Sequence, residues 1–568
     1  MSQTHYDKLS KERKKMQEAG TMPDWFTTGG WQMFKSKYLY GVKTVKEQYQ
    51  RIARTAAKHM PATSQDGNRT WEDRFFEVLW KGWVSCSTPV LANMGTDRGL
   101  PVSCSGQYIG DSINDFYKSR HEAAVLTKHG FGTSGYLADV RPRGAPIATG
   151  GTASGVLPLY KGFIQDMRDV AQGTARRGSF AGYFDPMGGD FDEIVHFVES
   201  NPDDANIGWT IRDVFIAALD RGDKEAIRRF KRILKMKMVT GKGYFHFVDK
   251  VNRHRPEAYI NNDLFVKASN LCSEIELFSD EEHTYTCVLS SMNLSKRNEW
   301  ENTDAIYVAT VFLHCVALEF LQKAQHIEGL EKAVRATEKG MALGLGACGF
   351  HTYLQKNRIE FESVEAMLFN NIVFSEMQSE SKRASAFLAT VFGEPEWCKG
   401  TGYANTHTMA IAPTKSTALI MGGISEGINP DPAMTFTQLT AAGEVDRANP
   451  ELLAIMKERG VYDKDHMKEL VASQGSVQNV DWLTDHEKRV FKTAFEINQE
   501  AIIRLAAARQ RYIDQGQSVN LFFSADESEA YIAKIHQLAF KHEWIFALYY
   551  CYSKSGVTGS NGECVACQ

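Results

Sequence analysis

The stretch Ser269-Asn270-Leu271-Cys272-Ser273-Glu274-Ile275 says more about the fold and the chemistry of this protein than any other part of its sequence. Its cysteine is flanked, two residues away on either side, by an amide and a carboxylate. In an extended loop, this spacing points the three side chains the same way. One face would then carry a thiol, a hydrogen-bonding amide and a base. A cysteine in an apolar run is more often structural, so the segment alone leaves both interpretations open.

The composition of the 568-residue chain is that of a globular protein, with 43% hydrophobic and 24% charged residues. That is enough for one large core or two to three ordinary ones. The formal net charge of -4 provides no global basic surface, which argues against nucleic-acid binding as the main task. No run reaches the roughly eighteen uninterrupted apolar residues of a membrane helix, and residues 1–20 are polar rather than signal-like. We therefore expect a cytoplasmic protein without a membrane or nucleic-acid partner.

Helical and strand-like patterns alternate along the chain, which favours an α/β architecture with buried strands. Apolar residues recur with helical periodicity in 45–57, 71–83 and 318–342. Glycine-rich turns separate these blocks from short apolar runs such as 244–248, which are typical of strands.

The chain divides into three predicted parts. Residues 1–36 form a short polar lead-in, and residues 37–552 a helical region joined to one catalytic domain. Residues 553–568 are rich in Ser, Gly, Thr and Asn and end in Cys564-Val565-Ala566-Cys567-Gln568. Such a composition predicts a mobile tail.

Three cysteines connect the chain to a known family. Asn270-Leu271-Cys272-Ser273-Glu274-Ile275 resembles the finger-loop motif of ribonucleotide reductase large subunits. Cys104 in Pro101-Val102-Ser103-Cys104-Ser105-Gly106 and Cys287 in Tyr285-Thr286-Cys287-Val288-Leu289 match the family's two redox positions in local sequence and chain order. The resemblance extends over nearly the whole chain from about residue 37. It implies a ten-stranded α/β barrel, made of two antiparallel five-stranded halves, with the finger loop at its centre and helices around it.

The resemblance also implies a role for each residue of the finger loop and for the two redox cysteines. Cys272 would carry a thiyl radical that removes the 3′ hydrogen of a ribonucleotide. Glu274 would take the 3′-hydroxyl proton and so help to expel the 2′-hydroxyl as water, while Asn270 holds the sugar. Cys104 and Cys287 would supply two electrons by closing to a disulfide. A hydrogen-abstracting sulfur should be a buried neutral thiol until it is oxidised, and needs no adjacent histidine.

The terminal Cys564 and Cys567 fit a shuttle that reopens the internal disulfide, with thioredoxin or glutaredoxin as the reductant that the family resemblance implies. The competing interpretation is half of a zinc site, which needs two more ligands that the tail does not offer nearby. A CxxC redox or zinc-binding interaction protein therefore stays as an alternative from a different functional class.

Other segments resemble the family's nucleotide sites. The hydroxyls, N–H groups and cation of residues 413–417 suit a phosphate, although an ordinary helix cap is the plainer interpretation without context. Resemblance implies a homodimer regulated by a dNTP or ATP effector. The substrate-binding residues would be Thr88, Ser103, Asn270, Glu274, Pro413, Thr414, Lys415, Ser416 and Thr417, and the effector-binding residues Asp111, Ser112, Ile113, Arg141, Gln172 and Arg177.

Tyr549 and Tyr550 match a pair that, in class I enzymes, carries an oxidising equivalent from a separate small subunit to the active-site cysteine. Adjacent tyrosines are also common where a core meets the surface. We therefore expect a class I enzyme that acts on diphosphates, binds no metal or cofactor itself, and receives its radical from a dimetal small subunit. The alternative is a class II enzyme dependent on adenosylcobalamin. Too few residues precede the core for the N-terminal ATP-binding domain of many relatives, so we expect no shut-off by dATP through such a domain.

Overall fold

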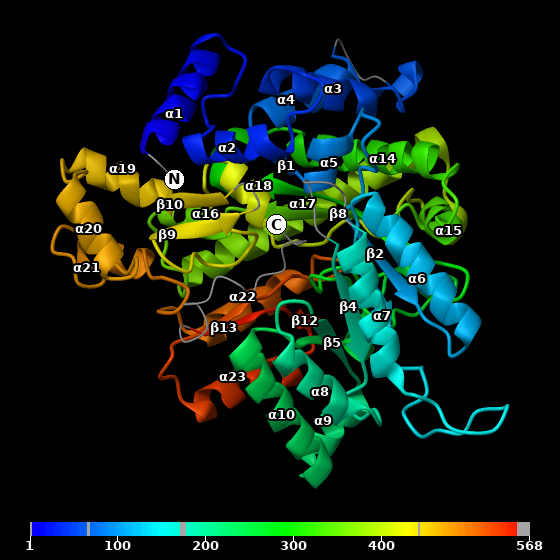
Figure 1. Cartoon of the computed structure of the whole chain (residues 1–568). Helices are drawn as coiled ribbons and strands as arrows, with labels where there is room; N and C mark the ends of the chain where they lie inside the picture. Colours follow the sequence, from blue (N-terminus) through cyan, green and yellow to red (C-terminus); the bar gives the residue numbers. More distant parts are fainter. Residues whose placement is uncertain (1–2, 65–68, 171–177, 441–442, 554–568) are drawn as a thin grey trace.

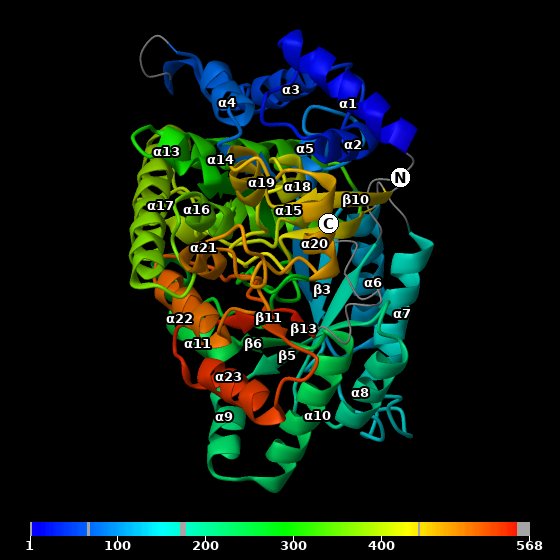
Figure 2. The same cartoon turned by 90° about the vertical axis from the view of Figure 1, so that its left-hand side faces the viewer.

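The computed structural model describes residues 3–64, 69–170, 178–440 and 443–553. Its centre is a curled sheet with helices around it (Figures 1 and 2). Five neighbouring parallel strands form the first half of this sheet. Parallel strands need crossover connections, and helices supply them here, so these strands are almost completely buried. The strands are β2 (Cys104–Tyr108), β3 (Gly132–Tyr136), β4 (Phe180–Phe184), β5 (Asn206–Ile211) and β6 (Tyr244–Phe247).

The second half begins with β7 (Tyr285–Asn293) and β8 (Leu343–Cys348), which are parallel to each other. Two extended segments without regular strand assignment continue it, residues 407–411 and 515–519. Backbone hydrogen bonds join β8 to the first segment (Leu343 N–H to His407 O, 2.9 Å) and the first segment to the second (Ile411 N–H to Gly516 O, 3.1 Å). The last member is β12 (Ala547–Leu548) with the residues that follow it.

The two halves close into a ring. β7 pairs antiparallel with β2 at one seam, and β12 pairs antiparallel with β6 at the other. The Tyr549 N–H completes the circuit by donating to Val519 O at 2.8 Å. Eight strands and two extended segments therefore make the ten members of the predicted barrel, and the predicted fold class is confirmed. The short strand β1 (Val84–Cys86) adds to the free part of the β7 edge.

Helices surround the ring (Figure 1). Those of the first half lie against β3 to β6, with α8, α9 and α10 grouped at one end of the molecule. Their bounds are α6 (Ile113–Lys128), α7 (Val156–Asp169), α8 (Phe191–Ser200), α9 (Asp213–Asp220), α10 (Lys224–Thr240), α11 (Val248–Arg253) and α12 (Glu257–Asn261). Those after β7 are α13 (Arg297–Trp300), α14 (Ala305–Ala324), α15 (Glu331–Gly340), α16 (Phe350–Lys356), α17 (Val364–Phe392), α18 (Lys415–Ile420), α22 (Gln499–Gln510) and α23 (Glu529–Lys541).

A helical layer covers the opposite end of the molecule (top of Figure 1). It consists of α1 (Gln3–Glu18), α2 (Thr28–Lys37), α3 (Val45–Ala57) and α4 (Trp71–Trp80), with α5 (Thr88–Asn93) leading into the barrel. The region predicted as a polar lead-in thus contains two helices, and Trp31 and Phe34 of α2 are buried in the main core. The predicted helix 45–57 is confirmed, and the one predicted at 71–83 ends three residues earlier.

The prediction of a single helix over residues 318–342 is wrong. The chain leaves the helix after Ala324 and re-enters one at Glu331, so that α14 and α15 are separate. Gly329, in the connection, has φ +89°, a conformation that glycine adopts readily and that a helix does not contain. Apolar periodicity runs on across the break because both helices bury a face in the same core.

Among the described residues, α14 is the one helix long and apolar enough to cross a membrane by length and composition, with a mean hydropathy of 1.7. However, 83% of that stretch is buried inside the protein. A helix that is apolar all round and buried is typical of the core of a large protein.

A small satellite with its own apolar core lies beside the barrel. It contains the hairpin β9 (Thr435–Thr440) and β10 (Gly443–Ala448) with α19 (Pro450–Glu458), α20 (Lys464–Ala472) and α21 (Asp485–Val490). Near the closing seam, β11 (Leu521–Phe523) pairs in parallel with β13 (Cys551–Ser553).

Candidate active site

One cavity gathers most of the predicted catalytic and substrate-binding residues. It lies between β1, the start of β2, the finger loop and the loop before α18, and has an empty volume of about 540 Å³, part of it open to solvent. Its lining includes Cys104, Cys272, Glu274, Thr88, Ser103, Pro413, Thr414, Lys415, Ser416 and Thr417.

The finger loop makes a tight turn at its tip, where an extended loop was predicted. The Ser273 N–H donates to Asn270 O at 3.2 Å, and Ser273 has φ +61°, a left-handed conformation that non-glycine residues seldom adopt. The Asn270 amide oxygen accepts hydrogen bonds from the N–H groups of Glu274 (3.0 Å) and Ile275 (3.2 Å). Its amide nitrogen donates to Cys104 Sγ at 3.4 Å. Cys272 and Glu274 therefore face the cavity, whereas Asn270 turns back to hold the loop.

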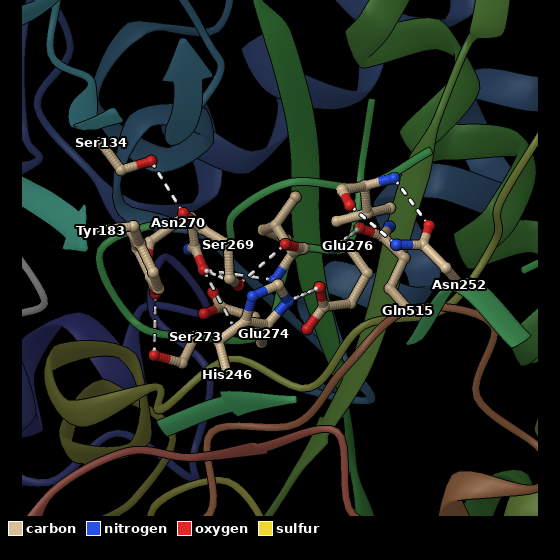
Figure 3. A network of polar contacts seen from close by, with 12 residues as sticks. Ser134, Tyr183, His246, Asn252, Ser269, Asn270, Ser273, Glu274, Glu276 and Gln515 are labelled. Atoms are coloured by element: carbon tan, nitrogen blue, oxygen red, sulfur yellow. Dashed lines mark hydrogen bonds and ion pairs between the residues drawn. The ribbon is translucent and has the colours of Figure 1, made fainter. Parts of the chain in front are cut away.

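Strands from both halves of the barrel anchor this turn (Figure 3). The Tyr183 hydroxyl on β4 donates to Asn270 O at 2.7 Å, and the Ser134 hydroxyl on β3 donates to Ser269 O at 3.0 Å. From the second half, the Ser518 hydroxyl donates to Cys272 O at 2.7 Å. The strained backbone at Ser273 is thus held by hydrogen bonds from three sides, which is how a functional turn keeps an unusual conformation.

Glu274 is suited to proton transfer at neutral pH. Its side chain is 1% exposed, and this burial raises the pKa of the carboxyl to about 7. The Asn270 amide and the Ser518 hydroxyl, 3.3 Å from Glu274 Oε2, act in the opposite direction. A carboxyl whose pKa lies near the working pH can both accept and return a proton.

Cys104 and Cys287 stand directly opposite each other on the antiparallel strands β2 and β7. Opposed residues in such a pair have Cα atoms about 4.5–5.5 Å apart, within the range of about 4.4–6.8 Å that a disulfide spans. Neither is in a disulfide in this structure and both are buried, and burial raises the pKa of the Cys287 thiol. The Gln515 amide nitrogen donates to Cys287 Sγ at 3.5 Å and to Leu343 O at 2.8 Å. The geometry therefore permits the dithiol–disulfide pair that the sequence suggested.

Glu276, His246 and Gln515 also support the finger loop and, like Tyr183 and Ser134, were not predicted. Glu276 accepts a 2.6 Å hydrogen bond from His246 Nε2 on β6, and both side chains are buried (Figure 3). The Glu276 N–H donates to Gln515 Oε1 at 3.2 Å, so Gln515 connects the finger loop to Cys287. Glu276 continues the alternation of Cys272 and Glu274 along the sequence, which was the one local signal available.

Hydroxyl groups and a cation also line the cavity. Thr414 has φ +58° and accepts a 2.8 Å hydrogen bond from the Gly427 N–H, which fixes the loop before α18. Lys415 is 4% exposed. Five lining serines have buried hydroxyls that find no hydrogen-bond partner among the described residues: Ser85, Ser87, Ser103, Ser290 and Ser416. Buried polar atoms in native proteins are nearly always satisfied, so these hydroxyls indicate a polar, anionic ligand.

Tyr549 and Tyr550 are buried behind the finger loop. Their rings are 4.4 Å apart at 63°, and they belong to the same cluster of side chains as Cys272 and Leu271. Tyr244 also packs on both rings, at 4.7 Å and 5.5 Å, and was not predicted. The pair therefore lies where the last step of a radical transfer to Cys272 would take place.

The four predicted effector residues that the structure describes, Asp111, Ser112, Ile113 and Arg141, are not among the residues that line the cavity. Arg141 donates to Asp111 Oδ2 at 2.6 Å, and Ser112 accepts the Asp115 N–H as the N-cap of α6. The Ile113 side chain is exposed on that helix. Among the other predicted residues, Gln172, Arg177, Cys564 and Cys567 fall outside the described residues.

Comparison with known proteins gives two matching sequence models of one family. Residues 24–99 match "Ribonucleotide reductase, all-alpha domain". Residues 102–227, 220–397 and 395–550 match "Ribonucleotide reductase, barrel domain". Together these matches cover most of the chain, including the finger loop and the cavity.

Individual relatives agree with the family models. The chain is 33% identical over 532 residues to the putative ribonucleoside-diphosphate reductase large subunit of frog virus 3, covering 87% of this chain and 92% of that protein. It is 30% identical over 565 residues to the ribonucleoside-diphosphate reductase large subunit of invertebrate iridescent virus 3, covering 85% and 88%. Among solved structures, the class Id ribonucleotide reductase alpha subunit of Actinobacillus ureae superimposes with a TM-score of 0.86 at 36% identity, covering 94% of this chain and 98% of that one.

Proposed function

Because this chain belongs to the ribonucleotide reductase large-subunit family, we propose that its cavity reduces ribonucleoside diphosphates at carbon 2′ by radical chemistry on Cys272. One observation carries the proposal. A single cavity brings together Cys272, Cys104 and Glu274 with Lys415 and buried serine hydroxyls that have no partner among the described residues. The relatives named ribonucleoside-diphosphate reductase support the diphosphate as substrate.

In the proposed reaction, Cys272 first loses a hydrogen atom and becomes a thiyl radical. The radical takes the 3′ hydrogen from the ribose, and Glu274 takes the 3′-hydroxyl proton. The 2′-hydroxyl then leaves as water after it receives a proton from the thiol of Cys104 or Cys287. The other thiol of the pair gives its hydrogen to carbon 2′, and the two sulfurs, having given up two electrons in all, close to a disulfide while Glu274 returns its proton to the 3′ oxygen. Cys272 finally returns its hydrogen to carbon 3′, so the radical is recovered.

Electrostatics suit each of these steps. Thiols in a buried, apolar setting stay neutral, as hydrogen-atom transfer requires, and burial raises the pKa of Cys287 accordingly. Glu274, with a pKa of about 7, is largely ionised slightly above neutrality and can act as the base. Lys415 and the loop 413–417 would hold the diphosphate, because a cation and hydrogen-bond donors bind anionic oxygens. Thr88 and Ser103 would contact the ribose or the phosphate. Asn270 would act mainly by holding the finger turn and Cys104.

The large-subunit family implies a small-subunit partner and nucleotide substrates. We propose further that the small subunit carries a dimetal centre and passes its oxidising equivalent through Tyr550 and Tyr549. A dNTP or ATP would act as effector at Asp111, Ser112, Ile113, Arg141, Gln172 and Arg177 of a homodimer. Cys564 and Cys567 would exchange with the Cys104–Cys287 disulfide, and thioredoxin or glutaredoxin would reduce them in turn. The proposed location is the cytoplasm.

The test is to assay the purified chain on the four nucleoside diphosphates with and without a candidate small subunit. We expect deoxynucleotide formation only when the small subunit is present, and a change in product preference when effectors are added. Turnover with adenosylcobalamin and no second protein would contradict the class I assignment. Retained activity in Cys272→Ser, with stoichiometric zinc in the protein, would instead favour a CxxC metal protein.

A further inference from the structure

A third tyrosine continues the buried pair toward the surface. Tyr552 lies on β13, and its ring is 5.5 Å from the Tyr550 ring at an angle of 30°. On its other side it stacks on Phe522 at 5.2 Å and 17°. Together with the 4.4 Å contact between Tyr550 and Tyr549, these contacts form a continuous column of rings that ends in the cluster containing Cys272.

Burial decreases along this column. Tyr549 is 0% exposed, Tyr550 2%, and Tyr552 is half-buried. Among the three tyrosines, Tyr552 is thus the one that a molecule docked on the surface reaches first. An oxidising equivalent that arrives from outside must cross the protein's outer layer before it reaches Tyr550, and Tyr552 occupies that position.

Backbone pairing holds the column rigid. Tyr552 is in register with Phe522 between the parallel strands β13 and β11, and the Leu521 N–H donates to Tyr550 O at 3.0 Å. The side chains of Tyr550 and Tyr552 share a strand face because they are two residues apart. From the other side, the Lys237 ammonium donates to Tyr549 O. Fixed ring spacing is what a relay between side chains requires, since its rate depends steeply on distance.

A cation flanks the two outer rings. Lys415 Nζ lies 5.7 Å from the centre of the Tyr550 ring and 5.6 Å from that of Tyr552. A positive charge this close, in a poorly solvated setting, opposes the formation of a second positive charge on either ring. Oxidation of these tyrosines therefore favours loss of the hydroxyl proton together with the electron, which leaves a neutral tyrosyl radical.

We propose that Tyr552 is a third radical-carrying tyrosine, the outermost member of a relay Tyr552–Tyr550–Tyr549–Cys272. The inference rests on the proposed class I function. In the first step, the oxidised small subunit takes one electron from Tyr552, whose phenolic proton leaves to the small subunit or to water. Tyr552 then regains an electron and a proton from Tyr550, Tyr550 from Tyr549, and Tyr549 takes a hydrogen atom from Cys272. Phe522 ends the column because a phenyl ring has no hydroxyl to oxidise in this way.

Phenylalanine substitutions distinguish a carrier from a packing residue, because the ring is kept and only the hydroxyl is lost. We expect Tyr552→Phe to reduce turnover with the small subunit by at least about a hundredfold, with unchanged nucleotide affinity. The matched control is Tyr353→Phe, since Tyr353 is also half-buried and stacks on a phenylalanine, Phe369, at 3.8 Å and 11°. This control should keep full activity.

The comparison with Tyr550→Phe separates failure of this inference from failure of the proposed function. If Tyr550→Phe is inactive while Tyr552→Phe keeps more than about half of the activity, Tyr552 is no carrier and the inference is overturned. If Tyr550→Phe is itself active, the class I relay is refuted along with it.

Electron paramagnetic resonance spectroscopy provides a second test, because it detects the radical directly. The more easily oxidised analogue 3-aminotyrosine, placed at position 552 in the full chain, should trap a radical that appears in the electron paramagnetic resonance spectrum when small subunit, substrate and effector are added. The analogue at position 353 should give none. A trapped radical at position 550 but none at position 552 would contradict the proposal, whatever the activity of Tyr552→Phe.

Discussion

The raised pKa of Glu274 makes a quantitative prediction about the pH dependence of the chemical step. If the ionised carboxylate is the base, the rate follows its ionised fraction, which for a pKa of about 7 is about 9% at pH 6 and about 91% at pH 8. The rate should therefore rise roughly tenfold over this range. An ordinary glutamate with a pKa of 4.5 would be almost fully ionised throughout and would give a flat profile.

The assay is a single turnover of the pre-reduced protein with saturating small subunit, normalised to the radical content of that subunit at each pH. Under these conditions neither the tail cysteines nor the external reductant takes part. The Glu274→Gln variant should be inactive at every pH. A flat profile between pH 6 and pH 8, or an active Glu274→Gln variant, would refute the role of Glu274 as the base.

Burial of the Glu274 carboxyl also affects the stability of the fold, which can be measured independently of activity. Because the folded-state pKa is raised from 4.5 to about 7, the neutral carboxyl stabilises the fold at low pH, and this contribution is lost as the pH rises through 7. Glu274→Gln should thus be more stable than the parent at pH 8, by up to about 3 kcal/mol, and the advantage should vanish near pH 4.5. Glu122, buried in α6 with a pKa also raised to about 7, provides the matched control. Glu122→Gln should show the same stability gain with an unchanged rate profile.

Three further predictions concern the tail cysteines, the proposed phosphate-binding residue Lys415 and the redox pair. Cys564→Ser should leave a single turnover intact but slow continuous turnover with thioredoxin at least about tenfold; an equal loss in both assays would argue against a shuttle. Lys415→Met should weaken equilibrium binding of nucleoside diphosphates by roughly ten- to a hundredfold, the usual cost of a lost charged hydrogen bond, and unchanged affinity would remove Lys415 from the phosphate site. Gln515→Leu deletes the hydrogen bond to Cys287 Sγ and should slow disulfide formation in a single turnover about tenfold; a normal rate would show that Gln515 does not position the thiol.

Features carried by local motifs could be predicted from the sequence. Cys272, Glu274 and Cys104 lie in short segments whose residue order is informative by itself, and the structure brings all three to one cavity. The helix 45–57 was predictable because its apolar face and its N-cap are encoded within a dozen residues.

Features that depend on distant residues were not predictable. The turn at Asn270 exists because Tyr183 and Ser518, from opposite halves of the barrel, hold a left-handed Ser273. The barrel itself closes through residues 407–411 and 515–519, which lack the alternation of ordinary strands. His246 and Glu276 are thirty residues apart, and nothing in either neighbourhood indicates their pairing.

The sequence contains only part of the evidence that Tyr552 belongs with the tyrosine pair. The alternation of Tyr550 and Tyr552 places both on one face if the segment is a strand. The sequence contains no indication that β11 lies alongside and stacks Phe522 on the outer ring. Without that neighbour, a third tyrosine near the surface looks like an ordinary amphipathic residue.

The central claim is that Cys272 initiates a reaction whose electrons come from Cys104 and Cys287. It is tested most directly by quantifying deoxynucleotide and disulfide after a single turnover of the pre-reduced protein with its small subunit, with peptide mapping by mass spectrometry. In the protein with Cys564→Ser and Cys567→Ser, whose tail cannot take over the disulfide, we predict one Cys104–Cys287 disulfide for each deoxynucleotide. Adding Cys272→Ser should abolish both products, although that variant still binds nucleotide. Deoxynucleotide formed without Cys272, or formed by the tail variant while Cys104 and Cys287 remain thiols, would contradict this role of the three cysteines.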